Sequence, residues 1–208
     1  MSADIAWGLF ILASVLLIIT PGQDMVLVMS RSLAHGARAG VATAAGVGVG
    51  LVGHTVLASL GLGALLRAFD GLFIMMKLIG AAYLVWLGFA LLRAGATEFT
   101  AATGGGRTGW RCFREGALSN IANPKIAVFY FAFLPQFVAA DAARPTLAIF
   151  VLGLVFAGLT FLIKAPVGLA AGHLAGALRA RPAVLVWIAR TSAAALILLG
   201  VQLALARR

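Results

Sequence analysis

A chain of 208 residues that is 62% hydrophobic and only 11% charged leaves too few polar side chains to cover a soluble domain. Its formal net charge of +10 does not indicate nucleic-acid binding, because the arginines gather in short segments between apolar runs. The single cysteine, Cys112, excludes a disulfide framework and a thiolate metal cage. The composition therefore predicts an all-α membrane protein.

Six long apolar segments follow one another along the chain. The run from Ile5 to Gln23 carries no charged residue, and neither does the run from Ala39 to Leu66. Because about 20 apolar residues span a bilayer as a helix, each segment is predicted to cross the membrane. The predicted spans are, in chain order, 5–30, 40–66, 71–92, 115–140, 146–172 and 183–206.

Arginines are distributed unequally between the two sides of these spans. Eight lie in the connections after the first, third and fifth spans, and four lie on the other side. The positive-inside rule places the richer side in the cytoplasm. Both termini are then expected outside, with the long connection between the third and fourth spans inside.

Two of the segments contain a proline near their midpoint, Pro21 in the first and Pro124 in the fourth. Proline within a helix removes a backbone hydrogen bond and clashes with the preceding turn. Gly22 follows the first proline and Asn123 precedes the second, which favours a break in the helix over a simple kink. A proline kink remains the alternative.

The segment 94–114 is rich in glycine, threonine and alanine and divides the single membrane domain into two halves, 1–93 and 115–208. Each half holds three spans and begins with the broken one. An odd number of spans per half forces the halves into opposite orientations, which is the inverted-repeat arrangement of many secondary transporters. The sequence thus predicts two inverted three-helix repeats whose broken helices meet at the membrane midplane.

Four sequence motifs resemble those of one family. They read TPGQD at 20–24, AGVGVGLVGHTVLASLGL at 45–62, KLIGAAYLVWLG at 77–88 and EGALSNIANPKIAVFYFAFLPQF at 115–137. The chain resembles the lysine-exporter family, and within it the branch that exports homoserine, threonine and other amino acids (LysE/RhtB). The resemblance implies a multi-pass exporter of the bacterial inner membrane, driven by the proton gradient. Gln23 stands where the commonest form of the family has a second proline, which predicts a softer first break.

Five of the six segments each contain one charged residue. A charge in the hydrocarbon core costs about 2.5–3.5 kcal/mol on insertion scales, so such residues usually face a bundle interior or an aqueous path. Asp24, the only acid within a span, is interpreted as a proton-coupling or substrate-binding group, with a cap of the second half-helix as the alternative. Lys125 and Lys77 are interpreted as partners of Asp24 or of a substrate carboxylate. Their alternatives are a structural ion pair and snorkelling to the surface, respectively.

Further polar residues within the spans are secondary candidates. Lys164 and Arg190 lie about 10 Å from the cytoplasmic end of their spans and could snorkel. His54 is either a satisfied core residue or part of a proton relay. Gly46 and Gly50 form a GxxxG spacing, interpreted as packing within the chain, with a homodimer seam as the alternative. The remaining groups that could bind substrate or satisfy the broken backbone are Gly22, Gln23, Asn120, Asn123 and Gln136.

Secondary export of small amino acids in exchange for protons is the leading hypothesis. The excess of lysine over acid within the spans favours a carboxylate-bearing substrate, and among amino acids the neutral ones, such as homoserine, threonine or leucine. A divalent-cation exporter would need several intramembrane acids or His and Cys at ligand spacing, and an intramembrane enzyme would need a catalytic cluster. The sequence shows neither pattern, nor an ATP-binding GxxxxGK[ST] motif. The expected partners are a small amino acid, protons and the lipid bilayer, with no cofactor, metal or nucleic acid.

Overall fold

The computed structural model describes residues 5–20, 22–68, 70–93, 108–139, 142–171, 173 and 182–205. These residues form helices, and their one β-type contact is the isolated bridge between Ile5 and Val138. The helices are α1 (Trp7–Ile19), α2 (Gln23–His35), α3 (Ala37–Ala68), α4 (Asp70–Arg93), α5 (Gly109–Ile121), α6 (Pro124–Phe133), the 3-10 helix η1 (Leu134–Phe137), α7 (Pro145–Leu169) and α9 (Pro182–Leu205).

The helices coincide with the six predicted segments to within a few residues at most ends. The first predicted span is divided into α1 and α2 and the fourth into α5 and α6, while α3, α4, α7 and α9 each occupy one segment. By length and composition, Ala37–Gly61 and Pro145–Leu169 can each cross a membrane, and α1 with α2 can form a third, bent span. The prediction of an all-α membrane protein is confirmed, and a crossing by each of the other segments stays a prediction.

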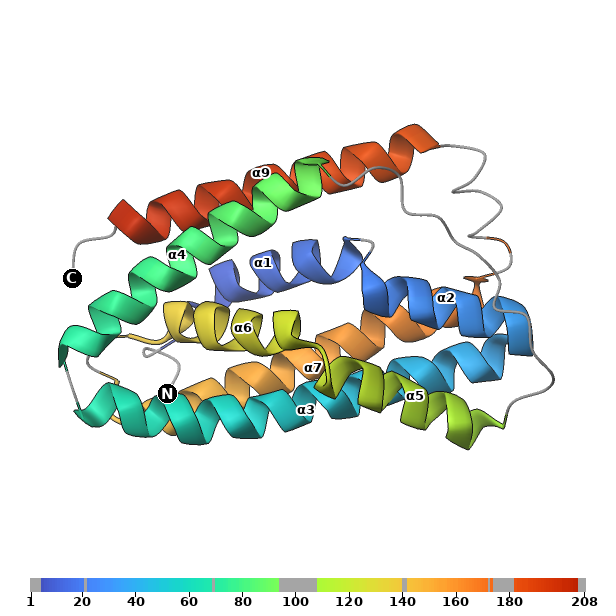
Figure 1. Ribbon diagram of the computed structural model, residues 1–208, viewed down its shortest axis with the longest axis horizontal. Helices are drawn as coiled ribbons and strands as arrows, with labels where there is room; N and C mark the ends of the chain where they lie inside the picture. Colours follow the sequence, from blue (N-terminus) through green and yellow to red (C-terminus); the bar gives the residue numbers. More distant parts are fainter. Residues whose placement is uncertain are drawn as a thin grey trace.

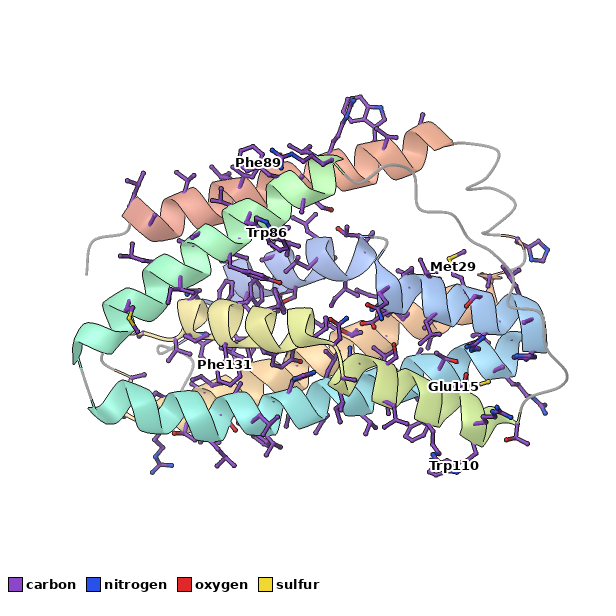
Figure 2. The ribbon with its side chains drawn as sticks, viewed as in Figure 1. Met29, Trp86, Phe89, Trp110, Glu115 and Phe131 are labelled. Atoms are coloured by element: carbon purple, nitrogen blue, oxygen red, sulfur yellow. The ribbon has the colours of Figure 1, made fainter. Side chains whose placement is uncertain are left out.

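Large apolar side chains cover much of the outside of the bundle. Soluble monomers seldom expose apolar surface on this scale, because water would drive it into contact with another surface. In Figure 2, Trp110 extends from α5 away from the other helices, as expected of a side chain in contact with lipid. The most exposed of these side chains are Leu57, Leu60, Trp110, Leu162, Leu169, Trp187, Leu198 and Leu205.

The helix α3 runs along one edge of the bundle and packs extensively along both α5 and α7 (Figure 1). Small residues allow the close approach to α5: a side chain at Gly46 would collide with the backbone of Phe113, and one at Gly116 with the backbone of Thr43. Gly50 lies against the side chain of Asn120 in the same contact. The predicted packing role of Gly46 and Gly50 is confirmed. Because α5 covers this face, the alternative of a homodimer seam there is wrong.

The helices α4 and α9 form a second tightly packed pair on one side of the bundle (Figure 1). Gly88 of α4 lies against Ala193 and Ile197, and Gly200 of α9 lies against Ala81 and Val85. This seam of small residues brings the third and sixth predicted spans together. The pair contacts the rest of the bundle mainly through the half-helices α1 and α6.

An aromatic cluster fills the space between α1, α6, η1 and α7. Phe10 of α1 packs edge-on against Phe137, and Phe133 contacts both of these rings. Phe129 and Phe156 extend the cluster toward the middle of the bundle. The Ala6 amide, on the same side, donates a hydrogen bond to the Phe137 carbonyl. These contacts close one end of the bundle.

The opposite end is formed by the C-terminal end of α2 and the N-terminal ends of α3 and α5 (Figure 1). The turn from α2 to α3 uses Gly36, whose φ of 89° is readily adopted only by glycine. Arg31 of α2 forms a salt bridge of 2.8 Å with Glu115 of α5, and Arg111 lies 3.5 Å from the same carboxylate. The segments expected to share a side of the membrane therefore lie at one end.

Candidate functional site

The first helix break lies between α1 and α2, as predicted. The two helices meet at an angle of 50°. Gly22, the residue before α2, has extended backbone geometry, and the Thr20 hydroxyl donates a 2.7 Å hydrogen bond to the Leu16 carbonyl at the end of α1. Pro21 itself lies outside the described residues. A bend of this size with non-helical backbone is a break, so the alternative of a proline kink is wrong here.

The second break separates Ile121 from Pro124, again as predicted. Proline has no N–H, so the carbonyl of Asn120 cannot accept the usual helical hydrogen bond from position 124. It accepts instead from the Asn123 amide at 3.0 Å and from Nε2 of His54 at 3.1 Å. His54 is therefore a core residue that satisfies the broken backbone, in agreement with the simpler of the two sequence interpretations.

Asp24 occupies the first turn of α2 and is 8% exposed. Its Oδ2 accepts a hydrogen bond from Asn120 Nδ2 at 3.1 Å and lies 3.3 Å from Nζ of Lys164. Its Oδ1 is buried and has no hydrogen-bond partner among the described residues. The carboxylate is directed to α5 and α7 and makes no capping hydrogen bond, while its place in the first turn of α2 keeps the favourable interaction with the helix dipole.

Lys164 is the described partner of this carboxylate. It lies on a buried stripe of α7 with Thr160 and Gly168, and it is 7% exposed. Snorkelling is therefore the wrong interpretation of Lys164, because its ammonium ends inside the bundle. Arg190 is exposed on α9 and belongs to a different surface.

A cavity of about 310 Å³ lies beside the ion pair. Asp24, Lys164 and Thr160 provide part of its polar lining, while α4 contributes Tyr83. The apolar part of the lining comes from α1, α3, α4, α6 and α7, and comprises Leu17, Ile18, Leu51, Leu87, Ala90, Ile126, Phe129 and Phe156. The cavity thus combines one compensated charge pair with a mainly apolar wall.

The two breaks touch at the edge of this cavity. The Asn123 amide Nδ2 donates a 3.0 Å hydrogen bond to Oε1 of Gln23, and both residues line the cavity together with Gly22. The expectation that the two breaks approach one another beside a cavity is confirmed by this contact, but the wall of the cavity is mainly apolar and not polar as expected.

Other predicted residues are not part of the described cavity. Gln136 is half-buried in η1 and does not line it. The side chains of Lys77, Pro124 and Lys125 lie outside the described part of the chain. Sequence reasoning also missed lining residues such as Tyr83, Thr160 and Phe156. Of these, only Thr160 carried a signal, because it lies one helical turn before Lys164.

Comparison with known proteins identifies the family. The family model of the LysE type translocator matches residues 15–207. The chain belongs to this family. Its members are membrane transporters rather than enzymes, in agreement with the expectation from the motifs. No solved structure matches this chain.

Curated relatives of this LysE family member have names that refer to efflux. A homoserine/homoserine lactone efflux protein of Salmonella typhimurium is 37% identical over 142 residues, covering 68% of each chain. A leucine efflux protein of Klebsiella pneumoniae is 30% identical over 153 residues, covering 73% of this chain and 72% of its own. An uncharacterized membrane protein of Pseudomonas aeruginosa is 35% identical over 172 residues, covering 78% and 80%, respectively.

Proposed function

We propose that this protein is a secondary transporter that exports small neutral amino acids from the cytoplasm across the bacterial inner membrane, in exchange for protons. The observation that carries the proposal is the buried Asp24–Lys164 ion pair at a helix break, facing a cavity between the two halves of the chain. Family membership and the efflux names of its relatives support the direction and class of transport.

The dimensions of the cavity suit a small solute. Ligand pockets in proteins span about 300–1,000 Å³, and the 310 Å³ cavity is at the lower end of this range. Its polar groups are concentrated at the helix breaks and its remaining wall is apolar. This distribution fits an amino acid whose α-ammonium and α-carboxylate groups lie at the helix breaks and whose neutral side chain contacts the apolar wall.

Asp24 is the proposed proton carrier. A proton on its carboxylate removes the charge that holds the Lys164 ammonium and leaves the Asn120 hydrogen bond in place. Deprotonation restores the ion pair. The carboxylate can thus alternate between a proton and a cationic partner, which is the property that coupling to a proton gradient requires.

The packing of the helices supports two inverted halves, 1–93 and 115–208. The contact of α3 with α7 joins the second spans of the two halves, and the contact of α4 with α9 joins the third spans. The first span of each half contacts the second span of the other, since α5 packs on α3 and both α1 and α2 pack on α7. A two-fold axis between repeats predicts such pairings; the first spans match it only approximately, because α2 also packs on α3 of its own half.

A reconstituted transport assay tests the function. Proteoliposomes containing the purified protein are loaded with radiolabelled L-homoserine, L-threonine or L-leucine and diluted into buffer with or without an imposed pH gradient. We expect release of at least one of the three, faster with protons moving in the opposite direction. In Asp24→Asn, release should lose its dependence on the gradient while membrane insertion stays intact. The function would be refuted if liposomes prepared without the protein released the amino acids at the same rate as the proteoliposomes.

Orientation is tested separately by reporter fusions. A periplasm-active reporter joined after Arg208 should be active, and one inserted at Gly105 should be silent. The opposite pattern would place the arginine-rich connections outside and reverse the assignment of sides.

A divalent-cation exporter is the weaker alternative. Among the described residues, no group of three His, Cys, Asp or Glu side chains lies close enough to hold a metal ion. The described acid at the cavity is already paired with a lysine, whose charge would repel a cation.

A further inference from the structure

Taking the proposed function as its basis, we propose that the Asp24–Lys164 ion pair occupies the binding site for the α-ammonium and α-carboxylate groups of the substrate. The incoming zwitterion separates the pair: its ammonium binds Asp24, and its carboxylate binds Lys164 and the first turn of α2. The side chain of the substrate then lies against the apolar wall.

One buried acceptor is available for the ammonium. Oδ1 of Asp24 has no hydrogen-bond partner among the described residues, although it is shielded from solvent and Asp24 lines the cavity. Buried polar atoms are rarely left without a partner, and each such atom needs an explanation. An α-ammonium has three N–H donors and would satisfy this acceptor.

Two residues of α3 that lie one helical turn apart, Gly50 and His54, fix the position of Asn120. The Asn120 side chain lies directly over Gly50, where any side chain would collide with it. Its carbonyl accepts the hydrogen bond from His54. Asn120 is therefore held in place to donate its hydrogen bond to Asp24, which positions the carboxylate before a ligand binds.

Two groups are available for the carboxylate. Nζ of Lys164 has three donors, and its one hydrogen bond among the described residues is to Asp24, at 3.3 Å. The first turn of α2 begins at Gln23 beside the cavity, and the amides of a first helical turn have no partner within their helix. The helix dipole adds a partial positive charge at this point, which favours an anion.

The exchange keeps every charge compensated. Breaking a buried ion pair is costly because it leaves an unpaired charge in a low-dielectric environment. A zwitterion replaces each lost partner with a group of the same sign, so the number of compensated charges stays equal before and after binding. A charged substrate side chain would meet Leu51, Phe129 and Phe156, which offer it no counter-charge. The site thus selects zwitterions with neutral side chains.

Analogues test this on the unmodified protein. Counterflow of radiolabelled L-leucine, L-threonine or L-homoserine into proteoliposomes is measured with increasing external competitor. The competitors are the free amino acid, its N-acetyl derivative, which has no ammonium, and its amide, which has no carboxylate. Each derivative should compete about 10- to 100-fold more weakly than the free amino acid, the loss expected for one charged hydrogen-bonded contact.

Variants test the assignment of the two partners. Lys164→Met should abolish counterflow and, in a binding assay with the same radiolabelled amino acid, should remove the difference between the free amino acid and its amide. Asp24→Asn should instead reduce the difference between the free amino acid and its N-acetyl derivative. Arg190→Met removes an exposed positive charge from α9 and is the matched control, with counterflow unchanged.

The outcomes separate the two proposals. If the unmodified protein moves none of the three amino acids, the proposed function fails and this site assignment fails with it. If it moves one of them but the N-acetyl derivative and the amide compete as well as the free amino acid, only the site assignment is refuted. The same conclusion follows if Lys164→Met retains normal counterflow.

Discussion

Both helix breaks interrupt the helical hydrogen bonding of the backbone, but different side chains surround the two interruptions. At the first, between α1 and α2, a buried carboxylate needs a cation from α7 to compensate it. At the second, between α5 and α6, the buried Asn120 carbonyl accepts from the backbone N–H of Asn123 and from the His54 ring. Under the proposed mechanism, a proton on Asp24 would change the bonding at the first break and leave that at the second unchanged. The first break would then carry charge, and the second would be a fixed support.

The largest expected effect comes from removing one charge at the first break. Lys164→Met leaves the Asp24 carboxylate buried without its described partner and should lower the free energy of unfolding by about 3–5 kcal/mol. The double variant Asp24→Asn/Lys164→Met removes both charges and should recover most of this loss, without recovering transport. Thermal unfolding in detergent measures the stabilities of the unmodified protein, the two single variants and the double variant, which together form a double-mutant cycle. Additive losses in the double variant would show that the two groups do not compensate one another.

At the second break, His54→Phe should cost about 1–3 kcal/mol, because the Asn120 carbonyl loses a buried donor. His54→Gln keeps a donor and should cost less. His35→Phe, at the end of α2 and away from both breaks, is the control. The same thermal unfolding assay applies. Equal stability of His54→Phe and the unmodified protein would contradict a supporting role for His54.

A substitution in α3 can also disturb the packing of Asn120. A Cβ at Gly50 would lie 2.8 Å from the Asn120 side chain and 3.0 Å from the Ala117 carbonyl. Gly50→Ala should therefore cost about 1–3 kcal/mol through overpacking and should slow transport. Gly158→Ala is matched to it, since nothing lies within 4 Å of a Cβ there. In that control, the higher helix propensity of alanine should give unchanged or slightly higher stability.

The smallest effect is expected where the breaks touch. Gln23→Ala removes the exposed hydrogen bond to Asn123 and should cost about 0.5–1.5 kcal/mol at most. Gln23→Pro loses the same bond but places proline at the first position of α2, where its fixed φ is favourable. The proline variant should therefore be the more stable of the two, with slower transport if the first break must flex. The reverse order of stability would show that backbone freedom at Gln23 is needed for folding.

The helices and their breaks could be predicted because hydrophobic length and local backbone chemistry determine them. Proline alone does not predict a break, since Pro166 lies inside α7 without ending it. Pro21 and Pro124 differ from Pro166 in their neighbours, Gly22 and Asn123, which tolerate non-helical backbone. The local sequence was therefore sufficient to locate both breaks.

The partner of Asp24 could not be predicted in the same way. Lys164 and Arg190 lie at similar depths in their spans and received the same interpretation, yet Lys164 is buried against Asp24 and Arg190 is exposed. The rotation of α7 and α9 about their own axes decides between these outcomes. That rotation is set by glycine contacts between helices distant in sequence, such as Gly168 of α7 against Gly40 of α3. Hydrophobic periodicity does not indicate which distant helix will form such a contact.

The seam between α4 and α9 has a consequence for how the chain is made. The helix α4 (Asp70–Arg93) is synthesised well before α9 (Pro182–Leu205), and the segment 94–181 must emerge from the ribosome between them. With α4 inserted as predicted, its Gly88 face would meet lipid during that interval, because its partner helix has not yet been made. Displacing those lipid chains gives no hydrophobic gain, so the two helices must rely on close backbone contact at Gly88 and Gly200 to associate. A chain truncated before α9 would therefore leave the Gly88 face of α4 without its helix partner, while α4 keeps its contacts with α6.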